Sequence, residues 1–395
     1  MNSSRTAFAA AVVALTVPLA GVAASPAAAA ASAPAAAAVS TASTVGEKSV
    51  LSLPAPAGRF GVGLDTLHLV DRERTDPWVA SGPRELMVTL RYPARRGTGA
   101  PVGYLRTDEA RLLIEDRGLE GMVAPEVLAG TKSSSRAGAL PRVGRFPLVV
   151  LSPGFTVPRA SLTALAEDLA SRGYVVASVD HAYEASGVAF PGGRMLTCRA
   201  CEQMKEKEDY RKVSDGRARD VSFLLDRLTG RHPAWRHAWM IDERRIGMAG
   251  HSIGGAGTAA AMAADRRIRA GADLDGTLFT PVPENGLDGR PFLLMGTAED
   301  DPEHYENWAG NFGRLDGWKR WLTVEGSGHF TFTDFPVLGE QLGLPDPEVP
   351  LSGTRSVALT RKYVAAFFDL QLKGVPQPLL DGPSADNPEV RFHTP

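Results

Sequence analysis

The residues best suited to do chemistry in this chain lie in Gly250-His251-Ser252-Ile253-Gly254. The pattern Gly-x-Ser-x-Gly is typical of a serine raised on a sharp turn between a strand and a helix, where side chains two positions to either side would collide. An apolar run, 246–249, precedes the motif, and a small-residue helical stretch, 255–264, follows it. This setting, more than the pentapeptide alone, predicts a nucleophile elbow and a serine hydrolase.

A serine nucleophile needs a general base, and the expected chain order is serine, acid, histidine, each after its own strand. Three histidines follow Ser252, namely His304, His329 and His393. His329 is the one that directly follows a predicted strand, and the glycines on either side of Ser327 allow its loop to fold back toward the serine. We therefore predict His329 as the general base, whose protonation should lower the activity at acid pH.

The acid that orients this histidine has competing candidates. Asp275 follows the strand next after the elbow, and a group of acidic residues follows the strand after that one: Glu299, Asp300 and Asp301. Asp273 is a third option, because it lies two residues before Asp275 on the same predicted strand face. Position along the strands alone leaves the choice open.

An acyl-transfer site also needs two N–H donors for the oxyanion of its tetrahedral intermediate. We expect one donor from Ile253, the residue after the nucleophile, and one from a loop that follows an earlier strand. Ser152-Pro153-Gly154-Phe155 follows the apolar run 146–151. Gly154 permits a turn there, so Phe155 is the predicted second donor, and a plain tight turn is the alternative interpretation.

Buried strands and helices are expected to alternate around these residues. The predicted strands are 66–70, 86–92, 146–151, 174–179, 245–249, 268–274, 291–295 and 321–324. The predicted helices are 160–172, 217–228, 255–264 and 357–372. This pattern predicts an α/β fold in which a mostly parallel sheet lies between helices, with the site at the carboxyl ends of the strands.

A helical insert, 106–130, and a Ser/Gly-rich tether, 131–139, are predicted between the early strands. The insert is amphipathic, so it would either cover the site or pack on the sheet as a surface helix. Three aromatic residues follow the predicted base: Phe330, Phe332 and Phe335. They would form either an apolar wall for an acyl group or lipid, or core packing behind the loop.

The N-terminus has the plan of a secretory signal peptide, with Arg5 before an apolar stretch and a series of Ala-x-Ala sites after it. No positively charged stop follows, which disfavours a retained membrane anchor. We predict a signal peptide over 1–30, an Ala/Ser/Pro linker over 31–47 and a hydrolase domain over 48–395.

The charge and the cysteine content indicate which classes of ligand, covalent cross-link and metal site to expect. The 395 residues include 43 basic and 45 acidic side chains, a formal net charge of -2, which favours a neutral or apolar ligand over nucleic acid. The two cysteines, Cys198 and Cys201, predict a short disulfide in an exported protein. A zinc site would need four ligands, and no metal or organic cofactor is expected.

Four motifs resemble the platelet-activating factor acetylhydrolase family, of the plasma and intracellular type II kind: 149–155, 250–255, 272–276 and 328–335. They are similar also to secreted bacterial lipases and cutinase-like enzymes of the same α/β-hydrolase superfamily. In the family the acid lies in a Leu-Asp motif after the strand next to the elbow, which implies Asp275 as the acid here. The family's oxyanion donor falls on Phe155, although Ser152-Pro153-Gly154 replaces the usual Ser-His-Gly.

The resemblance implies a secreted carboxylic ester hydrolase, of the lipase or acetylhydrolase type, that works through an acyl-enzyme on Ser252. It implies short-chain acyl esters as substrates, phospholipid sn-2 esters among them, transient contact with a lipid surface, and no obligate protein partner. Acyl transfer or polyester hydrolysis with the same three residues are alternatives, and a non-catalytic binding protein is a third hypothesis.

Overall fold

A central sheet positions the candidate residues. The computed structural model describes residues 50–206, 209–298 and 302–393. Within these ranges, eleven strands form one sheet in the order β13-β12-β11-β10-β9-β5-β6-β2-β1-β4-β3. The strands from β6 through β5, β9, β10 and β11 to β12 run parallel, whereas β1 with β2, β2 with β6 and β12 with β13 pair antiparallel. The predicted α/β fold with a mostly parallel sheet is confirmed.

Eight of the eleven strands overlap the predicted apolar runs, and β3, β4 and β13 match none of them. The sheet contains β1 (Gly61–Thr75), β2 (Pro83–Ala94), β3 (Ala100–Pro101), β4 (Ser135–Ala137), β5 (Phe146–Ser152), β6 (Val175–His181), β9 (Ile241–His251), β10 (Ile268–Leu274), β11 (Phe292–Thr297), β12 (Lys319–Val324) and β13 (Val390–His393). A separate antiparallel hairpin is formed by β7 (Val188–Phe190) and β8 (Arg194–Leu196).

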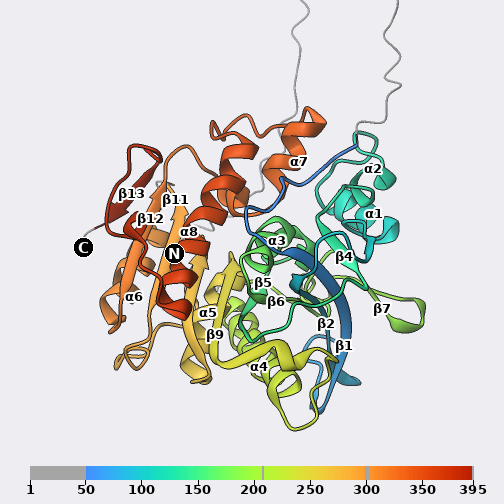
Figure 1. The fold of residues 1–395 in the computed structure, drawn as a ribbon, viewed down its shortest axis with the longest axis horizontal. Helices are drawn as coiled ribbons and strands as arrows, with labels where there is room; N and C mark the ends of the chain where they lie inside the picture. The colour runs from blue at the N-terminus through green and yellow to red at the C-terminus, as the bar shows by residue number, and fades with distance from the viewer. Residues whose placement is uncertain (1–49, 207–208, 299–301, 394–395) are drawn as a thin grey trace, which may run out of the picture. The chain divides into compact units, whose positions relative to one another are not determined.

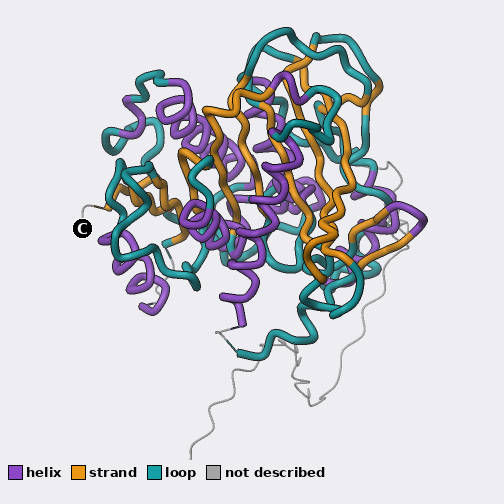
Figure 2. Tube along the Cα trace, turned by 90° about the horizontal axis from the view of Figure 1, so that it is seen from below, coloured by secondary structure: helices purple, strands orange, loops and turns teal. Residues whose placement is uncertain are grey.

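Helices flank the sheet on both faces (Figures 1 and 2). The α-helices of the described residues are α1 (Thr107–Asp116), α2 (Pro125–Ala129), α3 (Thr163–Ser171), α4 (Asp209–Thr229), α5 (Ile253–Ala264), α6 (Pro302–Arg314), α7 (Phe335–Leu342) and α8 (Gly353–Lys373). One apolar core joins α4 and α5 to one sheet face, and a second joins α3 and α8 to the other. The middle strands are buried on both faces, as their continuous apolar runs predict.

Local sequence explains how these helices sit. α5 is made of small residues, and a Cβ on its Gly255 would lie 1.7 Å from an oxygen of Asp273, so the glycine lets the helix approach the sheet closely. α8 begins after Ser352, whose side chain accepts a hydrogen bond from the Arg355 N–H, and ends before Gly374 in the left-handed region.

The predicted tether at 131–139 is wrong, because β4 pairs with β1 inside the sheet. Ser135 is buried, and its N–H and hydroxyl bond to the carboxylate of Glu167 at 2.7 and 2.6 Å. Arg91 donates to the same hydroxyl at 3.1 Å. The serine-rich segment therefore hydrogen-bonds to a buried carboxylate. Composition alone could not distinguish such a segment from a flexible, solvated loop.

The predicted insert at 106–130 is two helices, because the chain turns between α1 and α2 with Gly118 and Gly121 in the left-handed region. α1 and α2 lie side by side (Figure 1) and share a third apolar core with α7. The insert therefore packs on the segment that follows β12, rather than on the open face of the sheet.

Some expectations fall beyond the described residues, and some elements were not expected. The predicted signal peptide, 1–30, and linker, 31–47, lie outside the described residues. α6, α7 and β13 were not predicted, because their sequences mix polar and apolar residues. No helix in the described ranges combines the length and the apolar character that a membrane crossing requires.

Candidate active site

The turn between β9 and α5 has the geometry predicted for a nucleophile elbow. β9 ends at His251 and α5 begins at Ile253, so Ser252 makes the turn with φ 55° and ψ -127°, values that non-glycine residues rarely adopt. A Cβ on Gly250 would lie 2.1 Å from the carbonyl carbon of Gly254, and one on Gly254 would lie 2.1 Å from the Ser152 oxygen. Both glycines are thus required by close backbone approach.

Three of the residues named from the sequence meet at the carboxyl edge of the sheet. Nε2 of His329 lies 3.0 Å from Oγ of Ser252, and its Nδ1 lies 2.6 Å from Oδ2 of Asp275. Ser252 follows β9, Asp275 follows β10, and His329 opens a short turn after β12. Loops from three separate strands therefore place a hydroxyl, an imidazole and a carboxylate in one chain of contacts.

The environment of Asp275 fixes the tautomer of the histidine. Burial opposes the ionisation of this carboxyl, but the hydrogen bond and the charge of His329 outweigh it, so the pKa of Asp275 is lowered. Its other oxygen accepts the Thr297 N–H at 2.7 Å. An ionised carboxylate can only accept, so Nδ1 of His329 carries the proton, and Nε2 is left to accept the hydroxyl proton of Ser252.

The competing candidates lie elsewhere or outside the described residues. Asp273 lies against α5, where its Oδ1 accepts the Gly276 N–H at 2.9 Å, and burial with the nearby charge of Asp275 raises its pKa well above the usual range. His304 contacts Thr277 at 2.9 Å, and His393 contacts Thr323 at 2.6 Å. A further group of predicted acids lies outside the described residues: Glu299, Asp300 and Asp301.

The two predicted oxyanion donors belong to segments in contact. β5 ends at Ser152, and a Cβ on Gly254 would lie 2.7 Å from the Pro153 oxygen, so the loop before Phe155 packs on the start of α5. Ile253 is the first residue of α5, where backbone N–H groups have no acceptor within the helix. Among the described residues, no hydrogen-bond acceptor contacts the Phe155 N–H.

His251, the variable residue before the serine, was not singled out from the sequence. Its Nε2 donates to the backbone oxygen of His329 at 2.7 Å, and its ring fills the space beside Gly154, where a Cβ would lie 2.9 Å from Nδ1. Burial, and then the charge of His329, lower the pKa of His251 to about 3. It is a neutral support for the loop that carries His329, and the motif gave no signal of this role.

A cavity of about 940 Å³ opens beside His329. α1 and α2 form one wall, α7 and residues 344–353 form another, and Phe330 and Phe335 face it, whereas Phe332 is buried in the core. Core packing, one of the two predicted roles, is thus found for Phe332, whereas Phe330 and Phe335 line the cavity. Arg117 lies at this cavity, with its guanidinium 4.8 Å from the centre of the Phe330 ring, and donates to Thr156 at 2.9 Å.

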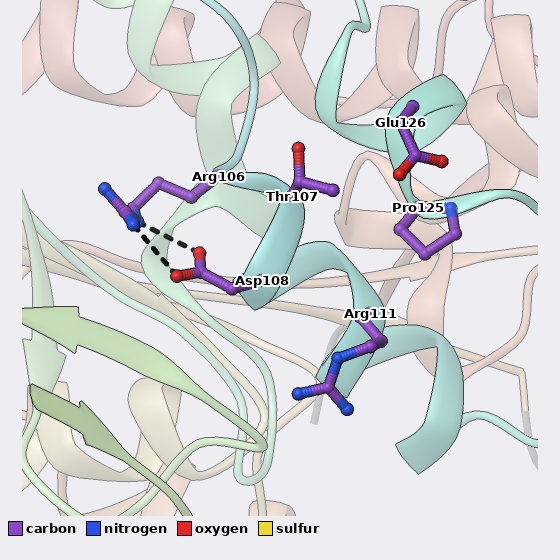
Figure 3. Close-up of a pocket in the computed structure, with 6 residues that line it drawn as sticks. All are labelled: Arg106, Thr107, Asp108, Arg111, Pro125 and Glu126. Carbon is purple, nitrogen blue, oxygen red and sulfur yellow. Dashed lines mark hydrogen bonds and ion pairs between the residues drawn. The ribbon is translucent and has the colours of Figure 1, made fainter. Parts of the chain in front are cut away.

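A second hollow lies over the N-terminal ends of α1 and α2 (Figure 3). Its lining is mostly polar or charged: Arg106, Thr107, Asp108, Arg111, Pro125 and Glu126. Arg106 and Asp108 satisfy one another at 2.9 Å. None of Ser252, Asp275 and His329 lines it.

The remaining predicted residues, the two cysteines, lie after the β7–β8 hairpin. Cys198 and Cys201 are joined by a disulfide. It closes a short loop between the hairpin and α4, and the Cys201 N–H also contacts the Cys198 sulfur at 3.2 Å.

Comparison with known proteins gives a consistent picture. The model of the family "Platelet-activating factor acetylhydrolase, isoform II" matches residues 121–218 and 235–344. A protein of Arthroderma benhamiae described as a probable 1-alkyl-2-acetylglycerophosphocholine esterase is 28% identical over 377 residues, which cover 86% of this chain and 93% of that protein.

One solved structure and one shorter sequence match are also similar to this chain. The structure of a ferulic acid esterase from Streptomyces cinnamoneus has a TM-score of 0.79 and 46% identity, and the match covers 87% of this chain and 100% of that one. A bis(hydroxyethyl) terephthalate hydrolase of Streptomyces coelicolor is 34% identical over 115 residues, 29% of this chain and 28% of that protein. These matches confirm the α/β-hydrolase fold and carboxylic ester hydrolysis.

The buried, neutral state of His251 predicts a pH-dependent stability. Because the pKa of His251 is about 3 when folded and near 6.5 when unfolded, the unfolded chain binds more protons below pH 6.5, so the folded state loses stability as the pH falls. One such proton is worth up to about 1.4 kcal/mol per pH unit. His251→Gln keeps a donor for the His329 oxygen but has no group that titrates. When the pH falls from 7.5 to 5.0, we expect its free energy of unfolding to decrease by about 2 kcal/mol less than that of the parent.

Urea unfolding at the two pH values measures this difference. His181 is also buried with a lowered pKa. It contributes equally to the pH dependence of the unfolding free energy in both proteins, so the difference between them reports on His251. Equal losses of unfolding free energy in parent and variant would contradict a neutral His251.

Proposed function

Because the chain belongs to the platelet-activating factor acetylhydrolase isoform II family and is a carboxylic ester hydrolase, we propose that it cleaves its substrate through a covalent acyl-enzyme on Ser252. The observation that carries the proposal is the pair of contacts from His329, at 3.0 Å to Ser252 and 2.6 Å to Asp275. A strained serine, an oriented imidazole and a buried carboxylate together form a nucleophile, a base and its support.

The first half-reaction forms the acyl-enzyme. Nε2 of His329 takes the hydroxyl proton as Oγ of Ser252 attacks the ester carbonyl, and the carbonyl electron pair moves onto oxygen. The N–H groups of Phe155 and Ile253 stabilise that oxyanion, and Asp275 stabilises the imidazolium. The imidazolium then gives its proton to the alkoxide, which leaves as the alcohol when the tetrahedral intermediate collapses.

The second half-reaction releases the acid. Water gives a proton to His329 and attacks the acyl carbonyl, and collapse returns the proton to Oγ of Ser252. Acyl transfer would replace this water with an alcohol, so competition by added methanol for the acyl group measures how far the enzyme acts as a transferase.

The substrate is a small-molecule or lipid ester, and we propose a short acyl group on an apolar alcohol. Since His329 returns the proton to the alkoxide, the alcohol side of the ester must lie within its reach. The cavity beside His329, with Phe330 and Phe335 on its wall, supports an apolar alcohol there. Phospholipid sn-2 esters are one candidate, supported by the description of the Arthroderma benhamiae protein as an acetylglycerophosphocholine esterase.

Esters of aromatic acids are a second candidate. The support is the 46% identity with a ferulic acid esterase, together with three rings on the oxyanion side of the site. Tyr210 stacks on Phe279 with ring centres 5.1 Å apart and meets Phe155 edge-on at 5.9 Å. The ratio of kcat/KM for methyl ferulate to that for methyl butyrate separates the two, because a ratio above one favours the aromatic acyl group.

We also propose export, with a signal peptide over 1–30, a linker over 31–47 and the hydrolase domain over 48–395. The disulfide between Cys198 and Cys201 supports this proposal, since such bonds persist in oxidising compartments. Outside the cell, the enzyme would meet a lipid surface only transiently.

Removing the nucleophile or the base should nearly abolish hydrolysis. We expect Ser252→Ala and His329→Ala each to lower kcat for p-nitrophenyl acetate by at least about 10⁴-fold, because the two side chains act as one unit. Exposed His232, replaced by alanine, is the matched control and should keep parental activity. Mass spectrometry after fluorophosphonate labelling should find the probe on Ser252, and a parental rate in Ser252→Ala would refute the assignment.

Filling the cavity should penalise one side of the ester only. Leu342 lines the cavity from α7. In Leu342→Trp, the larger side chain should displace part of the octyl chain of octyl acetate from the cavity. We expect kcat/KM to fall by about tenfold for every two methylene groups displaced. Ethyl octanoate, whose long chain is on the acyl side, should be hydrolysed at the parental rate. Exposed Leu140, replaced by tryptophan, is the control. Equal losses for both esters would contradict an alcohol-binding cavity.

A further inference from the structure

A buried polar cluster lies beneath the loop that carries Phe155, and the proposed reaction does not use it. Its members come from β5, the end of β6, the turn after β6, α4 and β2. None has more than 2% of its surface exposed: Arg84, Ser152, His181, Glu184, Arg217 and Asp220. Burying polar groups destabilises the folded state unless each group is paired. The hydrogen bonds of the cluster therefore show which parts of the chain it fixes.

Ser152, His181 and Asp220 repeat the serine, histidine and acid pattern inside the protein. Nδ1 of His181 lies 2.8 Å from Asp220, and its Nε2 lies 3.1 Å from the Ser152 hydroxyl. Burial opposes the ionisation of Asp220, but Arg84 and His181 outweigh it and lower the pKa of this carboxyl, so the carboxylate accepts and Nδ1 carries the proton. Burial, and then the charge of Arg217, lower the pKa of His181, so its Nε2 accepts from Ser152.

This arrangement is built to hold Ser152 rather than to activate it. Arg217 donates to the same hydroxyl at 3.1 Å, so the oxygen accepts one hydrogen bond and donates another. The hydroxyl is completely buried, and neither of the two cavities described above is lined by Ser152. A second bond from Arg217, to the Pro153 oxygen, fixes the next residue of the loop.

The far side of Phe155 is fixed by the same cluster. Glu184 accepts from Arg217 at 2.8 Å and from Arg84 at 2.7 Å, and its backbone oxygen accepts the Thr156 N–H at 3.0 Å. Thr156 has a φ of 67°, so its conformation depends on such restraints. The Arg217–Glu184 pair therefore anchors residues 152 and 153 before Phe155, and residue 156 after it.

We propose that Arg217, with the Ser152–His181–Asp220 chain and Glu184, positions the Phe155 N–H for the oxyanion. These are positioning residues, because they act through Phe155 and do not touch the substrate. The inference rests on the proposed acyl-enzyme mechanism. A donor stabilises the transition state only if it is held where the negative charge develops, so loosening the loop should affect the reaction more than the binding of the ester.

Ser152→Ala tests the proposal, because it removes the hydroxyl shared by Arg217 and His181. We expect kcat per active site, counted by fluorophosphonate titration, to fall between about tenfold and a few hundredfold, with KM changed less than threefold. The inhibition constant of a trifluoromethyl ketone, which forms an oxyanion on the serine, should rise by the same factor as kcat falls. Ser161→Ala is the matched control, because the buried Ser161 hydroxyl has no hydrogen-bond partner within the described residues.

Arg217→Lys gives a second route if Ser152→Ala does not fold. It keeps a cation beside Glu184 but loses the guanidinium fork, and we expect the same split between kcat and KM. Parental kcat and inhibitor affinity in both variants, or a rise in KM at unchanged kcat, would overturn the positioning role. The proposed mechanism fails separately, if the parent protein is not labelled at Ser252.

Discussion

The close backbone approach at the end of β9 is the constraint on which the rest of the site depends. Because Gly250 and Gly254 lack Cβ atoms, α5 can begin against the end of β5, and Ser252 is forced into a positive φ of 55° between them. The same approach brings the loop that ends at Phe155 beside the start of α5. A hydrogen bond of 2.8 Å from the Ser252 N–H to the Leu274 oxygen ties this turn to the strand before Asp275.

Three imidazoles near this edge of the sheet lie in different environments: His181, His251 and His329. His251 and His181 are buried with lowered pKa values, so they stay neutral and serve as hydrogen-bonding supports. The His329 side chain is 41% exposed and faces the carboxylate of Asp275. This exposure and the carboxylate partner, which stabilises the protonated imidazole, are what the proposed role of His329 as general base requires.

The sequence was informative where chemistry depends on local spacing. The elbow glycines, the order of Ser252 and His329, and the apolar strands could all be predicted, because each follows from a short pattern. Asp275 could be chosen only with the help of a family resemblance. The cluster around Arg217 could not be predicted, because its members are far apart in the chain and each is of a type that is usually exposed. Ser135 of β4 misled for the same reason, since burial depends on distant partners.

A crystal structure of the enzyme inhibited by a phosphonate ester would test the central claim most directly. The account predicts phosphorus bonded to Oγ of Ser252, with the phosphonyl oxygen about 2.7–3.1 Å from the backbone nitrogens of Phe155 and Ile253. Phosphorus on any other residue, or an oxygen that points away from both nitrogens, would contradict it.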